Sequence, residues 1–409
     1  MTAIALQKIG QAGQVRALIA LGGLVVLINY VDRGNIATAG PLIKDELGID
    51  NTTFGLLVSA FFWTYAPGQL VSGWLAQKFD AGRVLAVGLV IWALATIATG
   101  LVGGFTALLL LRLVLGAGES VTFPATSKLF SDHLSPEQYG ASNAATAMGL
   151  AFGPAFGVYV GGMVMAGVGW RPSFVLFGLV SLLWLVPWLR LQRDSAPIHA
   201  SHEAPPSYVA ILRKRELWGA AMALFCGNYA MYFMLAWLPL YLVKSHGFSM
   251  ATMASMGGMI YLLQGTSAAF FGWLSDRWIR NGMSVARSRM TMLSAGLLLN
   301  AVFLLAASAE NLTVAIGALF ASAVCGGMSS CNVFATAQTL AGPRAAGRWV
   351  GVQNFIGNLA GICAPVITGF IVDRTGHFSV AFGLAAAMLL AGGLSVLFVV
   401  RRIAPVEWD

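Results

Sequence analysis

The sequence contains few charged residues and few cysteines. Only 10% of its 409 residues are charged and 58% are hydrophobic, whereas roughly a quarter of a soluble domain is charged. This shortage excludes an ordinary soluble protein and indicates a chain that lies in lipid. All the cysteines lie in apolar stretches without CxxC spacing, so neither disulfides nor a metal site is predicted. They are Cys226, Cys325, Cys331 and Cys363.

The sequence also lacks the motifs of enzymes and of ATP-driven pumps. It has no glycine-rich loop followed by Lys-Ser or Lys-Thr, no nucleophile–base pair and no metal-binding set. We therefore expect that the protein is not an enzyme and uses no cofactor. The net charge of +8 does not indicate a nucleic-acid partner, because the basic residues lie in short loops between apolar spans.

Long apolar runs determine the predicted fold class. Residues 84–102 and 379–400 carry no charge, and each run can cross a ~30 Å hydrocarbon core as a helix that rises ~1.5 Å per residue. The runs are continuous rather than alternating, which excludes a barrel. We predict an all-α membrane protein with twelve transmembrane helices. The predicted spans are residues 15–38, 53–76, 84–103, 105–127, 140–164, 172–190, 218–243, 250–274, 288–308, 312–338, 347–371 and 377–400.

The lysines and arginines predict the orientation of these spans. An even number of spans places both termini on one side, and most basic residues then fall on that same side. Because basic loops face the cytoplasm, we expect a multi-pass protein of a bacterial-type inner (plasma) membrane with both termini cytoplasmic. The first apolar segment runs into a full-length span, which is typical of an uncleaved anchor.

The two halves of the sequence repeat each other. Gly73-Trp74-Leu75 recurs as Gly272-Trp273-Leu274, and Gly153-Pro154 recurs as Ala364-Pro365. Repeated halves are typical of secondary transporters, which bind substrate at the bilayer midplane between the repeats. The predicted organisation is two pseudo-symmetric six-helix halves and a polar cytoplasmic linker. Their ranges are 1–190 for the first half, 191–217 for the linker and 218–409 for the second half.

Four charged residues fall well inside predicted spans: Asp32, Arg33, Arg112 and Glu119. Each ionised group at the bilayer centre costs ~2.5–3.5 kcal/mol or more unless it is paired or hydrated. Arg112 and Glu119 share a helix face but lie roughly 10 Å apart, too far for a direct ion pair. Asp32 and Arg33 point ~100° apart. Either Asp32 pairs with Arg112, or Arg33 contacts substrate while Asp32 contacts another helix.

These charges allow two interpretations. They form a static network that locks two spans together, or they bind protons and an organic anion. Burial disfavours a charged carboxylate, so Asp32 and Glu119 can load and release protons. An arginine keeps its charge and offers a planar fork that matches a carboxylate. All histidines lie in loops, which leaves the two carboxylates as the proton carriers.

Neutral polar residues recur at helical spacing in other spans. Asn228 and Tyr232 are four residues apart, and Tyr65, Gln264 and Asn354 lie in three further spans. Such residues often only bridge neighbouring helices, at about 0.6 kcal/mol each. Several amides and hydroxyls beside an arginine also suit a polyhydroxy carboxylate, so we expect these five residues to bind substrate.

Two sets of motifs carry a resemblance to known transporters. Residues 73–83 (GWLAQKFDAGR) and 272–277 (GWLSDR) resemble the loop motif of the major facilitator superfamily, although Gln77 stands where that family usually has Asp. Residues 29–33, 112–119 and 353–361 resemble the anion:cation symporter family, whose members include galactonate, glucarate and hexuronate carriers and sialin. The resemblance covers nearly the whole chain.

The family likeness implies a role for each motif residue. Asp32 and Glu119 would be proton sites, and Arg33 and Arg112 would serve the anion or the coupling network. Tyr30, Tyr65 and Asn354 would contact substrate. We therefore expect a monomeric, proton-coupled symporter that imports a small organic anion by alternating access, most of all a sugar acid (hexonate, hexuronate or aldarate). The alternatives are an anion exchanger or exporter of the same fold, and a membrane sensor that binds the anion without transport.

Overall fold

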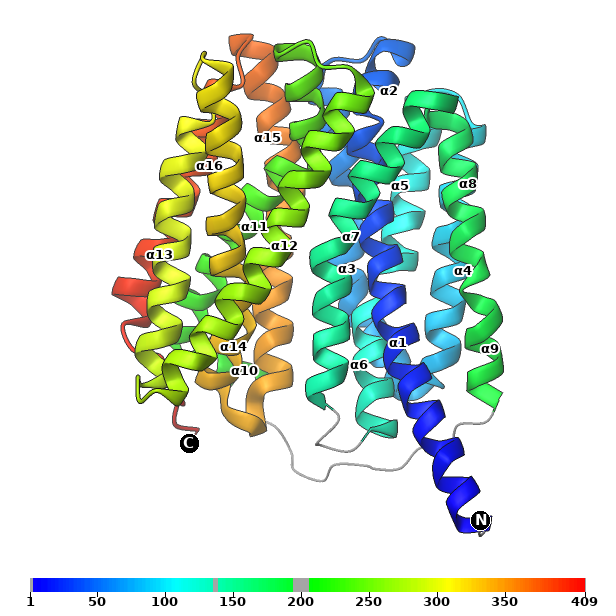
Figure 1. The fold of residues 1–409 in the computed structure, drawn as a ribbon, viewed down its shortest axis with the longest axis vertical. Helices are drawn as coiled ribbons and strands as arrows, with labels where there is room; N and C mark the ends of the chain where they lie inside the picture. The colour runs from blue at the N-terminus through cyan, green and yellow to red at the C-terminus, as the bar shows by residue number, and fades with distance from the viewer. Residues whose placement is uncertain (1–2, 135–138, 194–205, 409) are drawn as a thin grey trace. The chain divides into compact units, whose positions relative to one another are not determined.

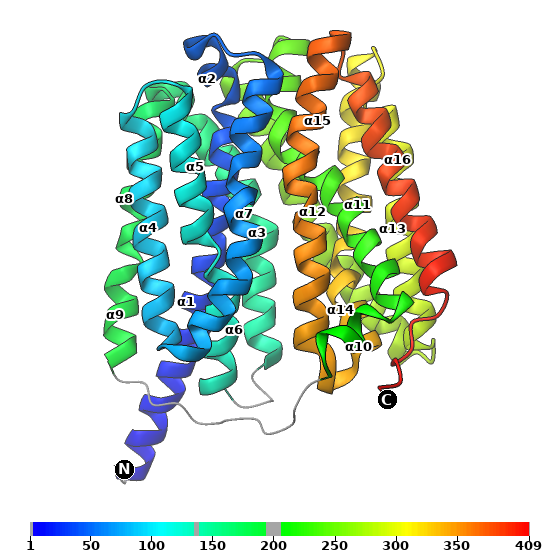
Figure 2. The same cartoon turned by 180° about the vertical axis from the view of Figure 1, so that it is seen from behind.

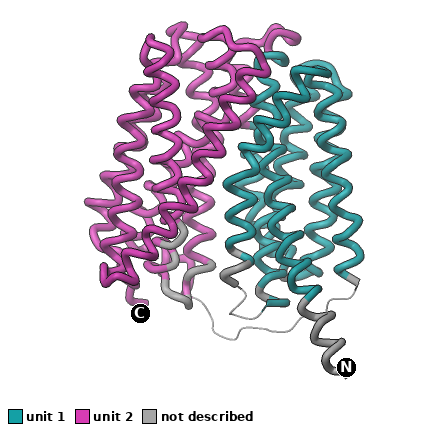
Figure 3. Tube along the Cα trace, viewed as in Figure 1, with its two compact units in different colours: residues 1–43, 60–202 teal, residues 44–59, 203–409 magenta. Residues whose placement is uncertain are grey.

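The computed structural model describes residues 3–134, 139–193 and 206–408. Every regular element within these residues is a helix, so the predicted all-α class is confirmed. Part of the predicted linker 191–217 lies outside the described residues. The chain divides into two compact units, shown in Figure 3. Unit 1 contains residues 1–43 and 60–202, and unit 2 contains residues 44–59 and 203–409.

Eleven helices of the described chain are long and apolar enough to cross a membrane. Each coincides with one of the predicted spans. The remaining predicted span, 250–274, lies in α12 (Met250–Arg280), a helix of 31 residues. Its serines, threonines and glycines and Gln264 make it less hydrophobic than the other spans. Because polar residues in a membrane helix usually face protein or a polar cavity, this composition fits a helix with a polar inner face.

Unit 1 is a bundle of helices in which α1 (Ala3–Thr38) packs along α7 (Tyr139–Val168), as Figure 1 shows. The contact is close because α7 has glycines where it meets α1. A methyl group added at Gly153 would lie 2.5 Å from Tyr30 Cβ, and one added at Gly157 would lie 2.9 Å from the Val31 carbonyl oxygen. The glycine run of this span is therefore a tight helix crossing.

The other helices of unit 1 pack against this pair or against one another. Helix α4 packs against α5 and α8, and α6 contacts both α1 and α4. The bounds are α4 (Ala81–Leu101), α5 (Phe105–Glu119), α6 (Thr122–His133), α8 (Trp170–Leu183) and α9 (Leu185–Arg193). Asp80 caps the N-terminus of α4 by accepting a hydrogen bond from the Arg83 amide at 2.8 Å. The predicted loop motif thus begins a helix.

Unit 2 is built around α11, which packs against α14, α15 and α16, and Figure 2 shows these helices from behind. The bounds are α10 (Tyr208–Leu212), α11 (Arg215–Leu240), η2 (Tyr241–Ser245), α13 (Val285–Ala306), α14 (Leu312–Asn358), α15 (Ala360–Thr375), α16 (Ser379–Ser395) and η3 (Val396–Val400). The chain's last described residues fold back onto α14. The Trp408 indole donates to the Ala341 carbonyl at 2.8 Å, and it packs against the buried apolar cluster to which Ala341 belongs.

Residues 44–59 belong to unit 2 because α15 holds them. They include the end of α2 (Gly40–Leu47) and the start of α3 (Asn51–Lys78). The Asp373 carboxylate accepts hydrogen bonds from the backbone and side chain of Asn51 and of Thr52, at 2.6 to 3.0 Å. The two backbone donors are the first amides of α3, which an acidic side chain is suited to cap.

The sequence repeat appears as the same local geometry in each unit. In α3 the Lys78 ammonium lies 4.7 Å from the Trp74 ring centre, and in α12 the Arg277 guanidinium lies 5.2 Å from the Trp273 ring centre. Each cation follows its tryptophan by one helical turn, so the pair shares a face. Both tryptophans are about half exposed, as expected for residues at the ends of membrane spans.

Candidate transport site

The four charged residues predicted inside spans are all buried in unit 1. Asp32 and Arg33 lie on α1, whereas Arg112 and Glu119 lie on α5. Their exposed fractions are 3%, 4%, 4% and 0%, respectively. Two helices that are distant in the sequence thus bring two acids and two bases into one part of the fold.

The central contact is an ion pair between Arg33 and Glu119. The Arg33 Nε donates to Glu119 Oε2 at 3.0 Å. Neither alternative from the sequence named this pair, because the relative rotation of α1 and α5 is not encoded in either helix alone. Glu119 therefore finds its partner on another helix, as its distance from Arg112 along α5 requires.

Aromatic rings enclose the Arg33 guanidinium. Its Cζ lies 4.2 Å from the Tyr65 ring centre, 4.6 Å from that of Tyr30 and 5.1 Å from that of Phe61. Phe61 also lies 5.1 Å from the Arg112 guanidinium. A desolvated cation–π contact is worth about 2 kcal/mol, so the rings compensate for part of the lost hydration. Phe61 was missed from the sequence, although it precedes Tyr65 by one helical turn.

Asp32 points to different partners from Arg33. Its Oδ1 accepts from the Asn35 amide at 3.4 Å, and Ser181 of α8 is a further neighbour of the carboxylate. About one helical turn before Asp32, Asn29 donates to the Thr122 hydroxyl of α6 at 3.3 Å. Asp32 and Arg33 thus face different helices, as their ~100° separation predicts.

In unit 2 the predicted amide residues gather at a helix break. Helix α14 ends at Asn358 and α15 begins at Ala360, which frees backbone carbonyls from the helical ladder. Asn228 donates to the Gly357 carbonyl at 3.0 Å, and Tyr232 donates to Asn358 Oδ1 at 2.7 Å. Asn358 in turn donates to the Asn354 carbonyl at 2.9 Å. These contacts hold α11 against the break.

Gln264 lies elsewhere in unit 2, on α12. A methyl group added at Gly326 would lie 3.3 Å from the Gln264 amide nitrogen and 3.4 Å from that of Asn300. Both amides therefore face the same glycine of α14. Asn300 also accepts from the Ser322 hydroxyl at 2.6 Å. The roles assigned to Gln264 and to the other site residues from the sequence stay predictions.

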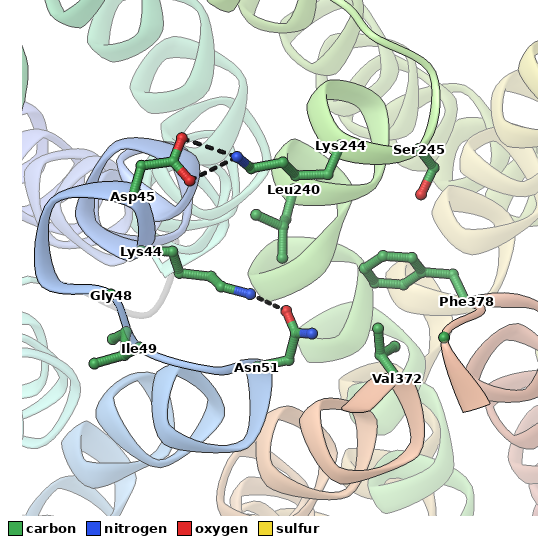
Figure 4. A pocket seen from close by; sticks show the side chains of 11 residues that line it. Lys44, Asp45, Gly48, Ile49, Asn51, Leu240, Lys244, Ser245, Val372 and Phe378 are labelled. Carbon is green, nitrogen blue, oxygen red and sulfur yellow. Dashed lines mark hydrogen bonds and ion pairs between the residues drawn. The ribbon is translucent and has the colours of Figure 1, made fainter. Parts of the chain in front are cut away.

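A separate cavity of about 510 Å³ lies at one end of unit 2 (Figure 4). Its lining includes Lys44, Asp45, Asn51 and Lys244. Lys244 donates to both Asp45 carboxylate oxygens at 2.6 and 2.8 Å, and Lys44 donates to the Asn51 side chain. Both ammonium groups are thus engaged by neighbouring oxygens. Within the described residues, no three His, Cys, Asp or Glu side chains gather closely enough to hold a metal ion.

Comparison with known proteins identifies the family. Residues 22–365 match the Major Facilitator Superfamily. The chain belongs to this superfamily. It is therefore a multi-pass membrane transporter and not an enzyme, as the sequence predicted. A solved bacterial homolog of the human lysosomal transporter Spinster shares the fold, with a TM-score of 0.76, 17% identity, and coverage of 95% of this chain and 96% of that one.

The superfamily contains relatives that carry organic anions. A hexuronate transporter of Bacillus subtilis is 30% identical, over 94% of this chain and 93% of the relative. A probable sulfoacetate transporter of Cupriavidus necator is 29% identical, over 92% of this chain and 91% of the relative. The predicted likeness to sugar-acid carriers is thus confirmed.

Proposed function

We propose that this transporter is a proton-coupled symporter that imports a sugar acid of the hexuronate, hexonate or aldarate class by alternating access. The observation that carries the proposal is the buried Arg33–Glu119 ion pair beside a second buried carboxylate, Asp32. A transporter that only needed rigid helix packing could use apolar side chains, which are often at least as stabilising as a buried ion pair.

The ion pair offers a direct way to couple a proton to an anion. While Glu119 is ionised, its carboxylate accepts a hydrogen bond from the Arg33 guanidinium. A proton on Glu119 removes its negative charge and weakens this contact. The guanidinium can then bind a substrate carboxylate through its planar fork. Proton binding and anion binding thus favour each other, and symport requires this coupling.

The membrane potential makes protons useful for anion import. A monoanion that enters a negative-inside cell moves against ~2.3 kcal/mol per 100 mV. One proton cancels this term, and two protons, on Glu119 and Asp32, make entry electrically favourable. The proposal places both termini in the cytoplasm, in a bacterial-type inner membrane, with a monomer as the transporting unit.

The proposed substrate class has support from both units and from the relatives. Arg33 and Arg112 in unit 1 supply charge for a carboxylate, whereas Asn228, Tyr232 and Asn354 in unit 2 supply amides and a hydroxyl. The hexuronate transporter carries a polyhydroxy acid. Sulfoacetate, the substrate in the name of the other relative, is an anion without hydroxyl groups and is therefore the informative competitor.

The test is uptake of labelled glucuronate and of labelled sulfoacetate into proteoliposomes with an inward proton gradient. Native protein is compared with Glu119→Gln, which cannot take up a proton, and with Glu119→Asp, which can. Counterflow at equal pH measures exchange without net proton movement. We expect the gradient to drive glucuronate accumulation in the native protein and in Glu119→Asp, and we expect Glu119→Gln to retain only counterflow.

Other outcomes separate the alternatives. If the native protein shows counterflow but the proton gradient does not drive uptake, the protein is an exchanger. Movement driven outward would make it an exporter, and tight binding without any flux would make it a sensor. Preference for sulfoacetate over glucuronate would contradict the proposed substrate class while leaving the coupling intact.

A further inference from the structure

Three polar side chains follow one another along the last two turns of α1. They are Asp32, Asn35 and Thr38, which we name the polar track. Thr38 is the last residue of α1 and of the first membrane span. Successive members are three residues apart, a rise of about 4.5 Å along the helix. The track therefore leads from the buried carboxylate to the end of the span.

The polar track is buried, and some of its polar atoms lack hydrogen-bond partners among the described residues. Asp32 is 3% exposed, and Asn35 and Thr38 are 0% exposed. Asp32 Oδ2, Asn35 Oδ1 and Thr38 Oγ1 have no hydrogen-bond partner among the described residues. The one contact within the track is the 3.4 Å bond from Asn35 to Asp32 Oδ1. Buried polar atoms of this kind are usually satisfied by ordered water.

Small residues of the neighbouring helices lie close against the track. Gly161 of α7 faces Asn35, and a methyl group added there would lie 2.9 Å from Asn35 Oδ1. Ser181 of α8 lies by the Asp32 carboxylate, but its hydroxyl donates to the Phe177 carbonyl at 2.9 Å. Because a serine has a single hydroxyl proton, Ser181 can donate to only one of these two acceptors at a time.

The charged groups near Asp32 lie on α5 and at the next position of α1. Glu119 and Arg112 act on it from α5, and Arg33 is its neighbour in sequence. The residues that continue from Asp32 toward the helix end carry no charge: Asn35 and Thr38 are neutral, as are Gly161 and Ser181 on the facing helices. A water molecule in the polar track would therefore contact neutral hydrogen-bonding groups, and no fixed charge would immobilise it.

We infer that the polar track binds a file of water molecules that conducts protons between Asp32 and the end of α1. One water bridges two groups up to about 5.6 Å apart, which spans each ~4.5 Å step. A proton passes by successive transfer along the hydrogen bonds, so each water gives up one proton as it receives another. The inference rests on the proposed function for its purpose, because it supplies the route by which Asp32 is loaded.

The test measures proton access to Asp32 directly, without transport. The carbonyl band of the protonated Asp32 carboxyl, identified by its loss in Asp32→Asn, shifts in infrared spectra when D₂O replaces H₂O. Stopped-flow mixing gives the exchange rate for the native protein, Thr38→Val and Gly161→Ala. Thr96→Val is the matched control, because it removes a buried hydroxyl of α4 in the same unit. Uptake with a gradient and counterflow are measured on the same proteins.

We expect Thr38→Val to slow deuterium exchange at Asp32 by about fivefold to tenfold, as for the loss of one hydrogen-bonding group. Gradient-driven uptake should fall in parallel while counterflow does not, and Thr38→Ser should restore the rate. Thr96→Val should match the native protein.

Exchange at the native rate in Thr38→Val and Gly161→Ala would overturn the polar track as a proton path. An equal loss of counterflow and of gradient-driven uptake would assign Thr38 a structural role and also overturn it. If exchange is slowed in the variants but a proton gradient does not drive uptake by the native protein, the proton path is supported and proton symport is contradicted.

Discussion

The two units bury different kinds of polar side chain. All the buried charged residues of the described chain lie in unit 1: Asp32, Arg33, Arg112 and Glu119. The buried polar residues of unit 2 are neutral amides and hydroxyls, such as Asn300 and Asn358. Both units belong to one superfamily fold and repeat the same Gly-Trp-Leu motif, so the difference is not a consequence of architecture.

This contrast suggests a division of labour. Buried charges are costly and gain or lose protons, which suits coupling. Neutral amides and hydroxyls cost less to bury and distinguish substrates by the hydrogen bonds they complete. Substitutions in unit 1 should therefore change coupling and stability, whereas substitutions in unit 2 should change apparent affinity and selectivity.

The largest effect is expected from breaking the ion pair of unit 1 on one side. Glu119→Leu leaves the buried Arg33 guanidinium without its carboxylate, and such a loss costs about 3–5 kcal/mol. The double substitution Arg33→Met with Glu119→Leu removes both charges and should recover most of that stability. Thermal unfolding in detergent measures both. An equal loss in the single and double variants would contradict a pair-specific cause.

A smaller effect is expected from the rings around Arg33. Tyr65→Leu removes the ring 4.2 Å from the guanidinium, a contact worth about 1–2 kcal/mol, so the free energy of unfolding should fall by about that amount. Tyr65→Phe keeps the ring face and should retain most of the stability. Thermal unfolding in detergent distinguishes them. Equal losses in both variants would assign the role of Tyr65 to its hydroxyl instead.

A substitution of a polar residue at the helix break of unit 2 should change the apparent affinity for substrate and leave proton coupling unchanged. Tyr232→Phe removes the 2.7 Å hydrogen bond to Asn358, worth about 1 kcal/mol, and should raise the apparent KM for glucuronate about fivefold. The ratio of uptake with and without a proton gradient should stay constant. Tyr241→Phe is the control, because that hydroxyl donates to a backbone carbonyl, that of Ala307. A changed gradient ratio in Tyr232→Phe would remove the division between the units.

The smallest effect concerns Lys44, beside the cavity of unit 2 and outside the spans. Burial, opposed by Asp373, lowers the pKa of Lys44 below its usual 10.5. The unfolded chain thus binds more protons just below pH 10.5, so stability should rise with pH through that window. Solvent screening keeps the rise below about 1 kcal/mol. Lys44→Gln should abolish it in thermal unfolding across pH, whereas Lys128→Gln should leave it unchanged.

The spans were the most predictable part of the fold. A run such as 379–400 has no charge, and lipid requires its backbone to bond within itself, so a helix follows from composition alone. The division at residues 44–59 was not predictable, because it depends on where Asp373 meets the start of α3.

The candidate site was predictable as a set but not as an arrangement. The cost of charge in lipid singled out Asp32, Arg33, Arg112 and Glu119 from the sequence. Helical periodicity also determined that Arg112 and Glu119 share a face and cannot pair. Phe61 was not found because a phenylalanine in an apolar span carries no signal of its own.

The sequence by itself thus determined which segments lie in the membrane, that the chain repeats, and which residues are too costly to be incidental. These properties depend on composition and on the fixed periods of the helix. Only the tertiary structure decided that Arg33 pairs with Glu119, that three rings enclose it, and that Asp32 turns toward Asn35. Those contacts depend on the rotation and separation of helices far apart in the chain, which packing of many side chains sets together.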